Sequence, residues 1–188
     1  ELKEITVNKI IKPTLKAMKD LGCPYTGILY AGLMITKEGP KLIEYNVRFG
    51  DPECQVILPR LKSDLLSLVI SSCKNSLKEE IIEWDDRFAL TIVMASKGYP
   101  NDYKTGYEIN GIKKASNQKD IYIYHAGTKK VNDITQTNGG RVLNITSLGK
   151  TVKEANKSAL SAVNMINWDG SYYRNDIGWR AIKREENE

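Results

Sequence analysis

The chain has 188 residues, a length that favours one medium-sized domain or two small ones. A hydrophobic content of 41% and a charged content of 27% are typical of a soluble globular protein, and no apolar run approaches the roughly 18 residues of a membrane-spanning helix. The formal net charge of +5 is spread along the sequence, which is typical of a solvated basic surface and suits anionic small substrates as well as nucleic acid.

Cysteine usage indicates the cellular compartment. The three cysteines, Cys23, Cys54 and Cys73, form no CxxC pair, and His125 is the sole histidine. This pattern argues against a disulfide framework and against a zinc site, so we expect a cytoplasmic protein. The first residues, ELKEITVNK, contain neither a signal peptide nor an initiator methionine, and this start suits an internal fragment.

The first elements in chain order are a helix and a hairpin. Residues 1–21 carry apolar side chains at mostly helical spacing, with Pro13 expected to kink or restart the helix and Gly22 at the C-cap position. This helix is expected to lie on a sheet. Residues 25–36 predict a strand, 37–40 a turn and 41–47 a returning strand, which together make an antiparallel hairpin.

The returning strand carries the polar residues of most chemical interest. Because side chains alternate along a strand, Glu44, Asn46 and Arg48 are expected on one face. A carboxylate and an amide carbonyl two residues apart are the hard oxygen ligands that Mg²⁺ or Mn²⁺ accepts, and Arg48 can offer a fork of donors to a phosphate or carboxylate. A solvated strand face is the competing interpretation, since any half-buried strand alternates in this way.

The rest of the chain predicts a helical segment and then a second domain. Residues 55–77 follow helical spacing, with Ser63 or Asp64 able to cap a helix, and a domain boundary is expected near Asp86. Strands are expected over 88–95, 106–112, 121–125 and 141–146. A capping box at Thr151 then opens a helix, so the order of elements predicts a small α+β domain.

Single polar and aromatic residues in this second part have structural explanations. His125 lies among apolar strand residues, where a packed or hydrogen-bonded histidine is expected rather than a catalytic base. We expect five tyrosines to lie in the core or on the surface rather than to form a platform that stacks nucleic-acid bases. They are Tyr99, Tyr103, Tyr107, Tyr122 and Tyr124.

Several stretches resemble one enzyme family. The most specific is RFGDPECQ at residues 48–55, and four others occur in the family's order: PYTGILYAGLM at 24–34, RLKSDL at 60–65, GGRVL at 139–143 and DIGWRA at 176–181. The chain resembles the C-terminal portion of phosphoribosylamine–glycine ligase, also called glycinamide ribonucleotide synthetase, of the ATP-grasp superfamily. The resemblance implies an α+β protein, with the C-terminal half of an ATP-grasp domain over 1–86 (an antiparallel sheet with packed helices) and a small α+β C-terminal domain over 87–188.

The resemblance also implies an activity in purine biosynthesis. The family ligates glycine to 5-phosphoribosylamine while hydrolysing ATP to ADP and phosphate, and a glycyl phosphate intermediate is implied. The expected partners are therefore glycine, 5-phosphoribosylamine, ATP and the missing N-terminal part of the enzyme, with neither nucleic acid nor membrane. Because the ATP lid and a Gly-rich phosphate loop are not among these residues, the fragment is expected to be inactive alone.

The implied roles concern the motif residues. Glu44 and Asn46 would hold Mg²⁺ or Mn²⁺ on the ATP phosphates. Arg48 would be catalytic, stabilising charge on the transferring phosphoryl group, or would bind the glycine carboxylate.

The turn after Arg48 is expected to contact substrate. Gly50 would let the turn approach the ligand, and Asp51 and Glu53 would bind the amine or the ribose hydroxyls; Asp51 is equally suited to locking the turn. Many ATP-grasp enzymes take a further carboxylate from the preceding strand, where this chain has Ala31 and Gly32, so the number of metal ions stays open.

Two alternatives remain beside the ligase. Another ATP-grasp carboxylate–amine ligase would share Glu-x-Asn-x-Arg, and a non-catalytic basic module would bind RNA or an acidic partner. Arg141 suits either a phosphate contact or an ordinary surface position. Residues 176–180 are expected to tie down the C-terminus.

Overall fold

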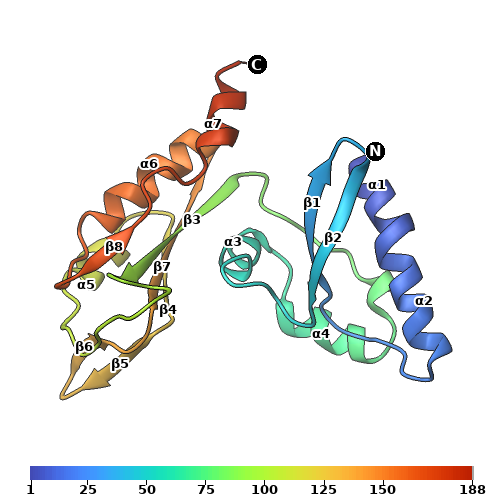
Figure 1. Ribbon diagram of the computed structural model, residues 1–188, viewed down its shortest axis with the longest axis horizontal. Helices are drawn as coiled ribbons and strands as arrows, with labels where there is room; N and C mark the ends of the chain where they lie inside the picture. Colours follow the sequence, from blue (N-terminus) through green and yellow to red (C-terminus); the bar gives the residue numbers. More distant parts are fainter. Residues whose placement is uncertain (188) are drawn as a thin grey trace. The chain divides into compact units, whose positions relative to one another are not determined.

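The computed structural model describes residues 1–187, which form two compact units (Figure 1). The first unit comprises residues 1–51 and 63–82, and the second comprises residues 52–62 and the described residues from 83 to 187. Both are built from antiparallel strands and helices, which confirms the predicted α+β class. The division into domains at residue 86 stays a prediction.

The first unit begins with a helical segment whose middle is irregular. Helix α1 (Leu2–Thr6) is followed by a π-helical turn (Val7–Ile11) and by α2 (Lys12–Asp20). Pro13 lies in the first turn of α2, and its missing N–H coincides with the change from the π turn to α-helix directly before it. Gly22, at φ +80°, ends the helix in a Schellman motif, since Cys23 N donates to Met18 O at 3.0 Å.

Strands β1 (Tyr30–Thr36) and β2 (Gly39–Asn46) form the antiparallel hairpin that the sequence predicts. The prediction that β1 starts at Tyr25 is wrong, because residues 25–29 have no regular structure. The register shifts between Gly32 and Leu33, so β2 carries one extra residue at this point. Asp64 caps the following helix α4 (Leu65–Cys73) by accepting from Ser67 N at 2.7 Å, and a 3₁₀ turn (Leu77–Glu79) follows.

Tyr45 attaches β2 to the first helical segment. Its hydroxyl lies 2.6 Å from Thr14 Oγ1 and 3.3 Å from the Ile10 carbonyl oxygen. The expectation that residues 1–21 form a helix lying on the hairpin is therefore confirmed.

The second unit is organised around a four-stranded antiparallel sheet with the order β4-β7-β3-β8 (Figure 1). Its strands are β3 (Phe88–Ser96), β4 (Ile121–His125), β7 (Arg141–Gly149) and β8 (Ser171–Tyr173). A separate hairpin joins β5 (Thr128–Val131) to β6 (Ile134–Thr137). The predicted strand over 106–112 is wrong: that segment makes only isolated bridges at Glu108 and Asn110 and then enters α5 (Ile112–Ser116).

Helix α6 (Val152–Val163) packs on β3 and β7 and buries the core. Ala155, Ala159 and Val163 are fully buried against strand residues such as Ile92 and Ile145. The predicted cap is confirmed, because Thr151 Oγ1 accepts from Glu154 N at 3.0 Å. Two short elements, α3 (Cys54–Ile57) and a 3₁₀ turn (Leu58–Arg60), also belong to this unit, and α3 contacts β3 and β7.

The C-terminal helix α7 (Trp179–Glu185) is fastened to α6. The Glu185 carboxylate accepts from the backbone N–H groups of Val152 at 2.7 Å and Lys153 at 3.2 Å, which have no partner within α6. Asn156 Nδ2 donates to Ile177 O at 2.9 Å. Residues 176–180 therefore lie in the segment that ties the C-terminus to the core.

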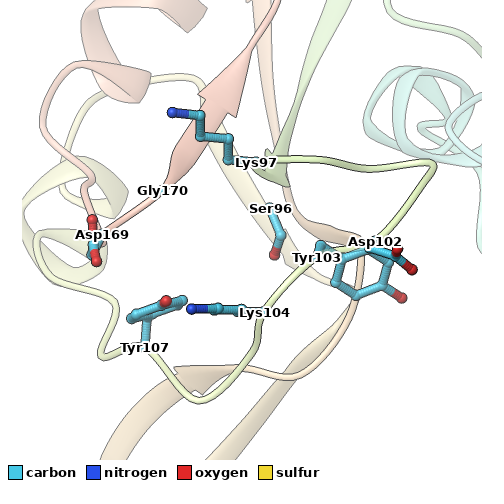
Figure 2. A pocket seen from close by; sticks show the side chains of 8 residues that line it. All are labelled: Ser96, Lys97, Asp102, Tyr103, Lys104, Tyr107, Asp169 and Gly170. Carbon is cyan, nitrogen blue, oxygen red and sulfur yellow. The ribbon is translucent and has the colours of Figure 1, made fainter.

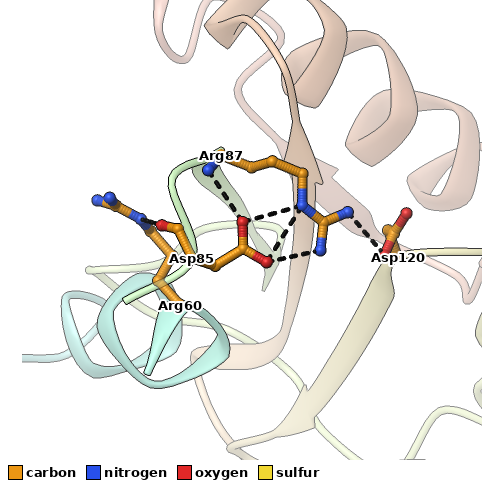
Figure 3. A network of polar contacts seen from close by, with 4 residues as sticks. All are labelled: Arg60, Asp85, Arg87 and Asp120. Atoms are coloured by element: carbon orange, nitrogen blue, oxygen red, sulfur yellow. Dashed lines mark hydrogen bonds and ion pairs between the residues drawn. The ribbon is translucent and has the colours of Figure 1, made fainter. Parts of the chain in front are cut away.

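A charged network joins the start of β3 to two other segments of the same unit (Figure 3). Arg87 Nη2 donates to Asp85 Oδ2 at 2.8 Å, and Arg87 Nη1 lies 3.0 Å from Asp120 Oδ1. Arg60 Nε donates to the Asp85 carbonyl oxygen at 3.1 Å. The hydrogen bonds from Arg87 hold the pKa of Asp85 well below its usual range.

Across residues 1–187, none of the helices combines the length and the apolar character that crossing a membrane would require.

Candidate active-site strand

The candidate site begins on β2, whose last residues carry Glu44 and Asn46. Asn46 Nδ2 donates to Glu44 Oε1 at 3.3 Å, so the two side chains lie together on one face, as the alternation predicts. Glu44 is exposed, and Asn46 is half-buried. An exposed carboxylate beside an amide can present two oxygen ligands once the amide turns its oxygen outward.

The neighbouring strand adds no acidic side chain to this pair. Gly32 is the cross-strand partner of Glu44, and a Cβ at Gly32 would lie 3.2 Å from Glu44 Cγ. The lack of a side chain at Gly32 leaves room for the methylene groups of Glu44. No group of three or more His, Cys, Asp or Glu residues within 1–187 is arranged to hold a metal ion. The donor set on this hairpin is therefore one carboxylate and one amide, which suits an ion that keeps other positions for water or phosphate oxygens.

Arg48 lies just beyond the end of β2. Its Nη1 donates to the Phe49 carbonyl oxygen at 2.7 Å, and the side chain is exposed. No carboxylate of residues 1–187 pairs with Arg48. A guanidinium has five donors, so this local hydrogen bond leaves donors that can turn toward a bound anion.

The remaining motif residues form the turn into α3. Gly50 is buried, Asp51 is exposed and Glu53 is half-buried at the N-cap of α3, where its carbonyl oxygen accepts from Val56 N at 3.1 Å. Residues 44–51 belong to the first unit and Glu53 to the second, so the structure brings together Glu44 and Asn46 but assigns Glu53 to a different unit.

Other candidate residues have structural explanations. His125 Nδ1 lies 3.0 Å from Thr128 Oγ1 on an exposed strand end, as expected for a hydrogen-bonded histidine. Trp179 stacks with Arg180, whose Cζ is 5.3 Å from the ring centroid. Arg141 is exposed at the start of β7.

Two family models match the sequence in the order that the motifs predict. The ATP-grasp (A) domain of phosphoribosylglycinamide synthetase matches residues 1–54, and the C domain of the same enzyme matches residues 89–180. The chain belongs to the phosphoribosylamine–glycine ligase family. This confirms the resemblance that the motifs indicate.

Relatives in this family are closely similar to the chain but longer. The phosphoribosylamine–glycine ligases of Salmonella typhimurium and Escherichia coli K12 are both 52% identical to it, over 100% and 97% of this chain and over 44% and 43% of their own lengths. The ligase of Brucella melitensis is 49% identical over 96% of the chain and 42% of its own length. The chain therefore spans less than half the length of these curated relatives.

Two solved structures have folds similar to that of the chain. The phosphoribosylamine–glycine ligase of Thermotoga maritima superposes with a TM-score of 0.79 at 32% identity, over 92% of this chain and 42% of that one. The N5-carboxyaminoimidazole ribonucleotide synthetase of Thermotoga maritima shares the fold at 16% identity and a TM-score of 0.53, over 81% of this chain and 39% of that one.

Proposed function

We propose that this phosphoribosylamine–glycine ligase chain is the C-terminal portion of an enzyme that joins glycine to 5-phosphoribosylamine. ATP would be consumed, and glycinamide ribonucleotide, ADP and phosphate would form through a glycyl phosphate. The observation that carries the proposal is the Glu44–Asn46 pair on β2, followed by Arg48. The identity to named ligases across almost the whole chain supports the same conclusion.

The proposed role of Glu44 and Asn46 is to hold Mg²⁺ or Mn²⁺, and their oxygen chemistry fits such an ion. When bound, the ion would neutralise charge on the ATP phosphates. Arg48, one pleat further along, would donate hydrogen bonds to the transferring phosphoryl group or to the glycine carboxylate. A carboxylate resists attack by an amine until it is activated, so holding glycine and phosphate in line is the main task of these residues.

The turn residues would complete the substrate contacts. Asp51 and Glu53 would accept hydrogen bonds from the amine or ribose hydroxyls of 5-phosphoribosylamine, and Gly50 would allow the backbone to approach it. We also propose that the rest of the enzyme, which supplies the ATP lid, is a partner of the first unit. We place the enzyme in the cytoplasm, because Cys23, Cys54 and Cys73 are all free thiols.

The test is Glu44→Gln in the full-length ligase, with Glu38→Gln as the matched control. Glu44→Gln keeps the shape but removes the charge that a hard cation prefers, so glycine-dependent phosphate release should fall by orders of magnitude and recover partly at raised Mn²⁺. Glu38 lies in the hairpin turn and accepts from Thr36 Oγ1, so its variant should keep the wild-type rate.

Apo stability separates a metal ligand from a structural residue. The melting temperature of Glu44→Gln without nucleotide should equal that of the wild type or exceed it, because an exposed carboxylate is removed from the strand face. A lower melting temperature with no rescue by Mn²⁺ would show that Glu44 has a structural role and would overturn the assignment.

A further inference from the structure

Four charged side chains of the second unit line a hollow between the segment after β3 and the turn before β8 (Figure 2). Lys97 and Lys104 point their ammonium groups in different directions, and Asp102 and Asp169 lie on opposite sides of the hollow. All four side chains are exposed, so water hydrates them and they indicate no ligand. A buried polar side chain on the central sheet is more informative.

That side chain is Asn144, which lies in the middle of β7 and is 1% exposed. Its Oδ1 atom has no hydrogen-bond partner among residues 1–187. A buried acceptor without a donor destabilises the folded protein, whereas an apolar side chain of similar shape would avoid that cost. Thr146, two residues further along β7 and fully buried, differs because its hydroxyl donates to Thr91 Oγ1 at 2.8 Å. Packing alone therefore does not account for an asparagine at position 144.

Asn144 projects from the face of the sheet that α6 does not cover. Ser147 Oγ donates to Ala155 O, so Ser147 faces α6. Because side chains alternate along a strand, Asn144 and Thr146 point to the opposite face. Tyr124 of β4 is the cross-strand partner of Asn144, and cross-strand partners share a face.

Helix α3 lies on this same face. It contacts both β3 and β7. Burial raises the pKa of Tyr124, and Tyr122 and Cys54 add smaller electrostatic contributions, which places Cys54 of α3 close to Tyr124. Cys54 directly follows Glu53, the N-cap residue of α3. A group that fixes α3 over Asn144 therefore also fixes the position of Glu53.

We propose that Asn144 is a positioning residue for the motif, holding α3 on the sheet through a buried water molecule. The Oδ1 atom requires a donor, and the described part of the chain places none within hydrogen-bond distance. Water is a donor small enough for such a site, and buried waters make about three hydrogen bonds to polar groups of this kind. This water would donate to Asn144 and would use its other hydrogen bonds for the Tyr124 hydroxyl and the α3 segment. The inference rests on the proposed function, because Glu53 is the proposed substrate contact that α3 carries.

The competing explanation is that Asn144 is a tolerated defect of the sheet. In that case an apolar side chain at this position would leave α3 where it is, since no hydrogen bond would be lost. If Asn144 instead holds α3 through water, an apolar side chain would loosen α3 while leaving the sheet as stable as before. The two explanations therefore differ in the behaviour of α3.

Hydrogen–deuterium exchange of the full-length ligase without nucleotide separates them. Asn144→Leu has the same branching as asparagine but no acceptor. Its peptide covering residues 53–60 should exchange roughly fivefold faster than that of the wild type, as expected for the loss of one hydrogen bond. The peptide covering β7 should be protected at least as well as in the wild type. Asn144→Ala, which cannot overpack the site, should also speed exchange at 53–60.

Thr146→Val is the matched control, because it lies on the same strand and face and is equally buried. It removes the hydrogen bond to Thr91, so exchange of the β7 peptide should become faster while that of 53–60 stays at the wild-type rate. The two substitutions should therefore have opposite effects on β7 and on α3.

Steady-state kinetics of the same proteins test the link to Glu53. In Asn144→Leu the KM for 5-phosphoribosylamine should rise about tenfold, with the KM values for glycine and ATP within about twofold of the wild type, because only one substrate contacts Glu53. Thr146→Val should have wild-type KM values for all three substrates.

Two results would overturn the inference. One is wild-type exchange at 53–60 in both Asn144 variants, and the other is faster exchange there with an unchanged KM for 5-phosphoribosylamine. The exchange measurement needs neither ATP nor turnover. A failure of the ligase assignment would instead appear as a wild-type protein without glycine-dependent phosphate release, so the two failures are distinguishable.

Discussion

Gly111 should be one of the least replaceable residues of the second unit. It precedes α5 at φ +87°, and a Cβ there would collide with the Met165 carbonyl oxygen and lie 3.3 Å from Ile166 Cα. Neither segment can move freely, because Asn110 N donates to Asn167 O at 2.9 Å and Asn167 N donates to Asn110 O at 3.1 Å. Gly111→Ala therefore strains the backbone and also forces apart two hydrogen-bonded segments.

Gly106→Ala is the matched control for the cost of the left-handed backbone conformation. Gly106 has φ +91°, close to that of Gly111, but a Cβ there meets nothing within 4 Å. The left-handed conformation costs about 1–2 kcal/mol for alanine, offset by roughly 0.4–1 kcal/mol from the less flexible unfolded chain. Gly106→Ala should thus lose about 1 kcal/mol. In Gly111→Ala, loss of the two hydrogen bonds adds roughly 2 kcal/mol, for a total of about 3 kcal/mol.

Guanidinium unfolding followed by tryptophan fluorescence measures the stability of the second unit in both variants. All three tryptophans, Trp84, Trp168 and Trp179, lie in the second unit, so the signal reports its unfolding. The difference between the two variants should be about 2 kcal/mol. Equal destabilisation would refute the reasoning, because it would show that the Met165 contact contributes nothing beyond the backbone conformation.

Three further predictions concern charged groups. Arg48→Lys in the full-length ligase should lower kcat at least about tenfold in steady-state kinetics with little change in melting temperature, because lysine loses the fork of donors; a wild-type kcat would remove Arg48 from the site. Asp85→Asn should destabilise the second unit at pH 7. Arg87 depresses the pKa of Asp85, so the stabilisation is complete above about pH 4, where the unfolded carboxyl is ionised, and declines as the pH falls toward the native pKa. The difference in unfolding free energy between wild type and variant should therefore be smaller at pH 3 than at pH 7, and an equal difference would contradict the argument. Glu185→Ala should cost about 1 kcal/mol in guanidinium unfolding, since Val152 N–H loses its acceptor, and no change would mean that water replaces the carboxylate.

Local rules were enough to predict much of the fold. Gly22 ends the first helical segment, and Thr151 caps α6, each as its residue type predicts. Strand alternation likewise placed Glu44 and Asn46 on one face, where their side chains now contact each other. All three predictions depend on residues that are close in sequence, and this is why the pattern was sufficient.

Pairing between distant segments could not be predicted in the same way. β8 has only three residues and pairs with β3 far back in the chain, so no local pattern indicates it. The hairpin β5–β6 does have a signal in the sequence, the pair Asn132–Asp133, although the sequence analysis predicted no hairpin there. Both residues have positive φ, the conformation of a tight two-residue hairpin turn that asparagine and aspartate tolerate. Lys97 N likewise donates to Gly170 O at 2.8 Å, a contact between segments far apart in the sequence that only the folded sheet arranges.

Burial differs sharply between the two units, and this bears on every test of the motif. Each buried apolar residue of the described chain lies in the second unit, whereas the first unit exposes 63% of Ile43, 70% of Val47 and 66% of Leu66. Full burial of such a side chain stabilises by about 1.5–3 kcal/mol, so the first unit lacks the main source of its stability. The proposed remainder of the ATP-grasp domain would cover these side chains. Because Glu44 and Asn46 lie on the same strand as Ile43, their geometry depends on that cover, and their variants are informative only in the full-length ligase.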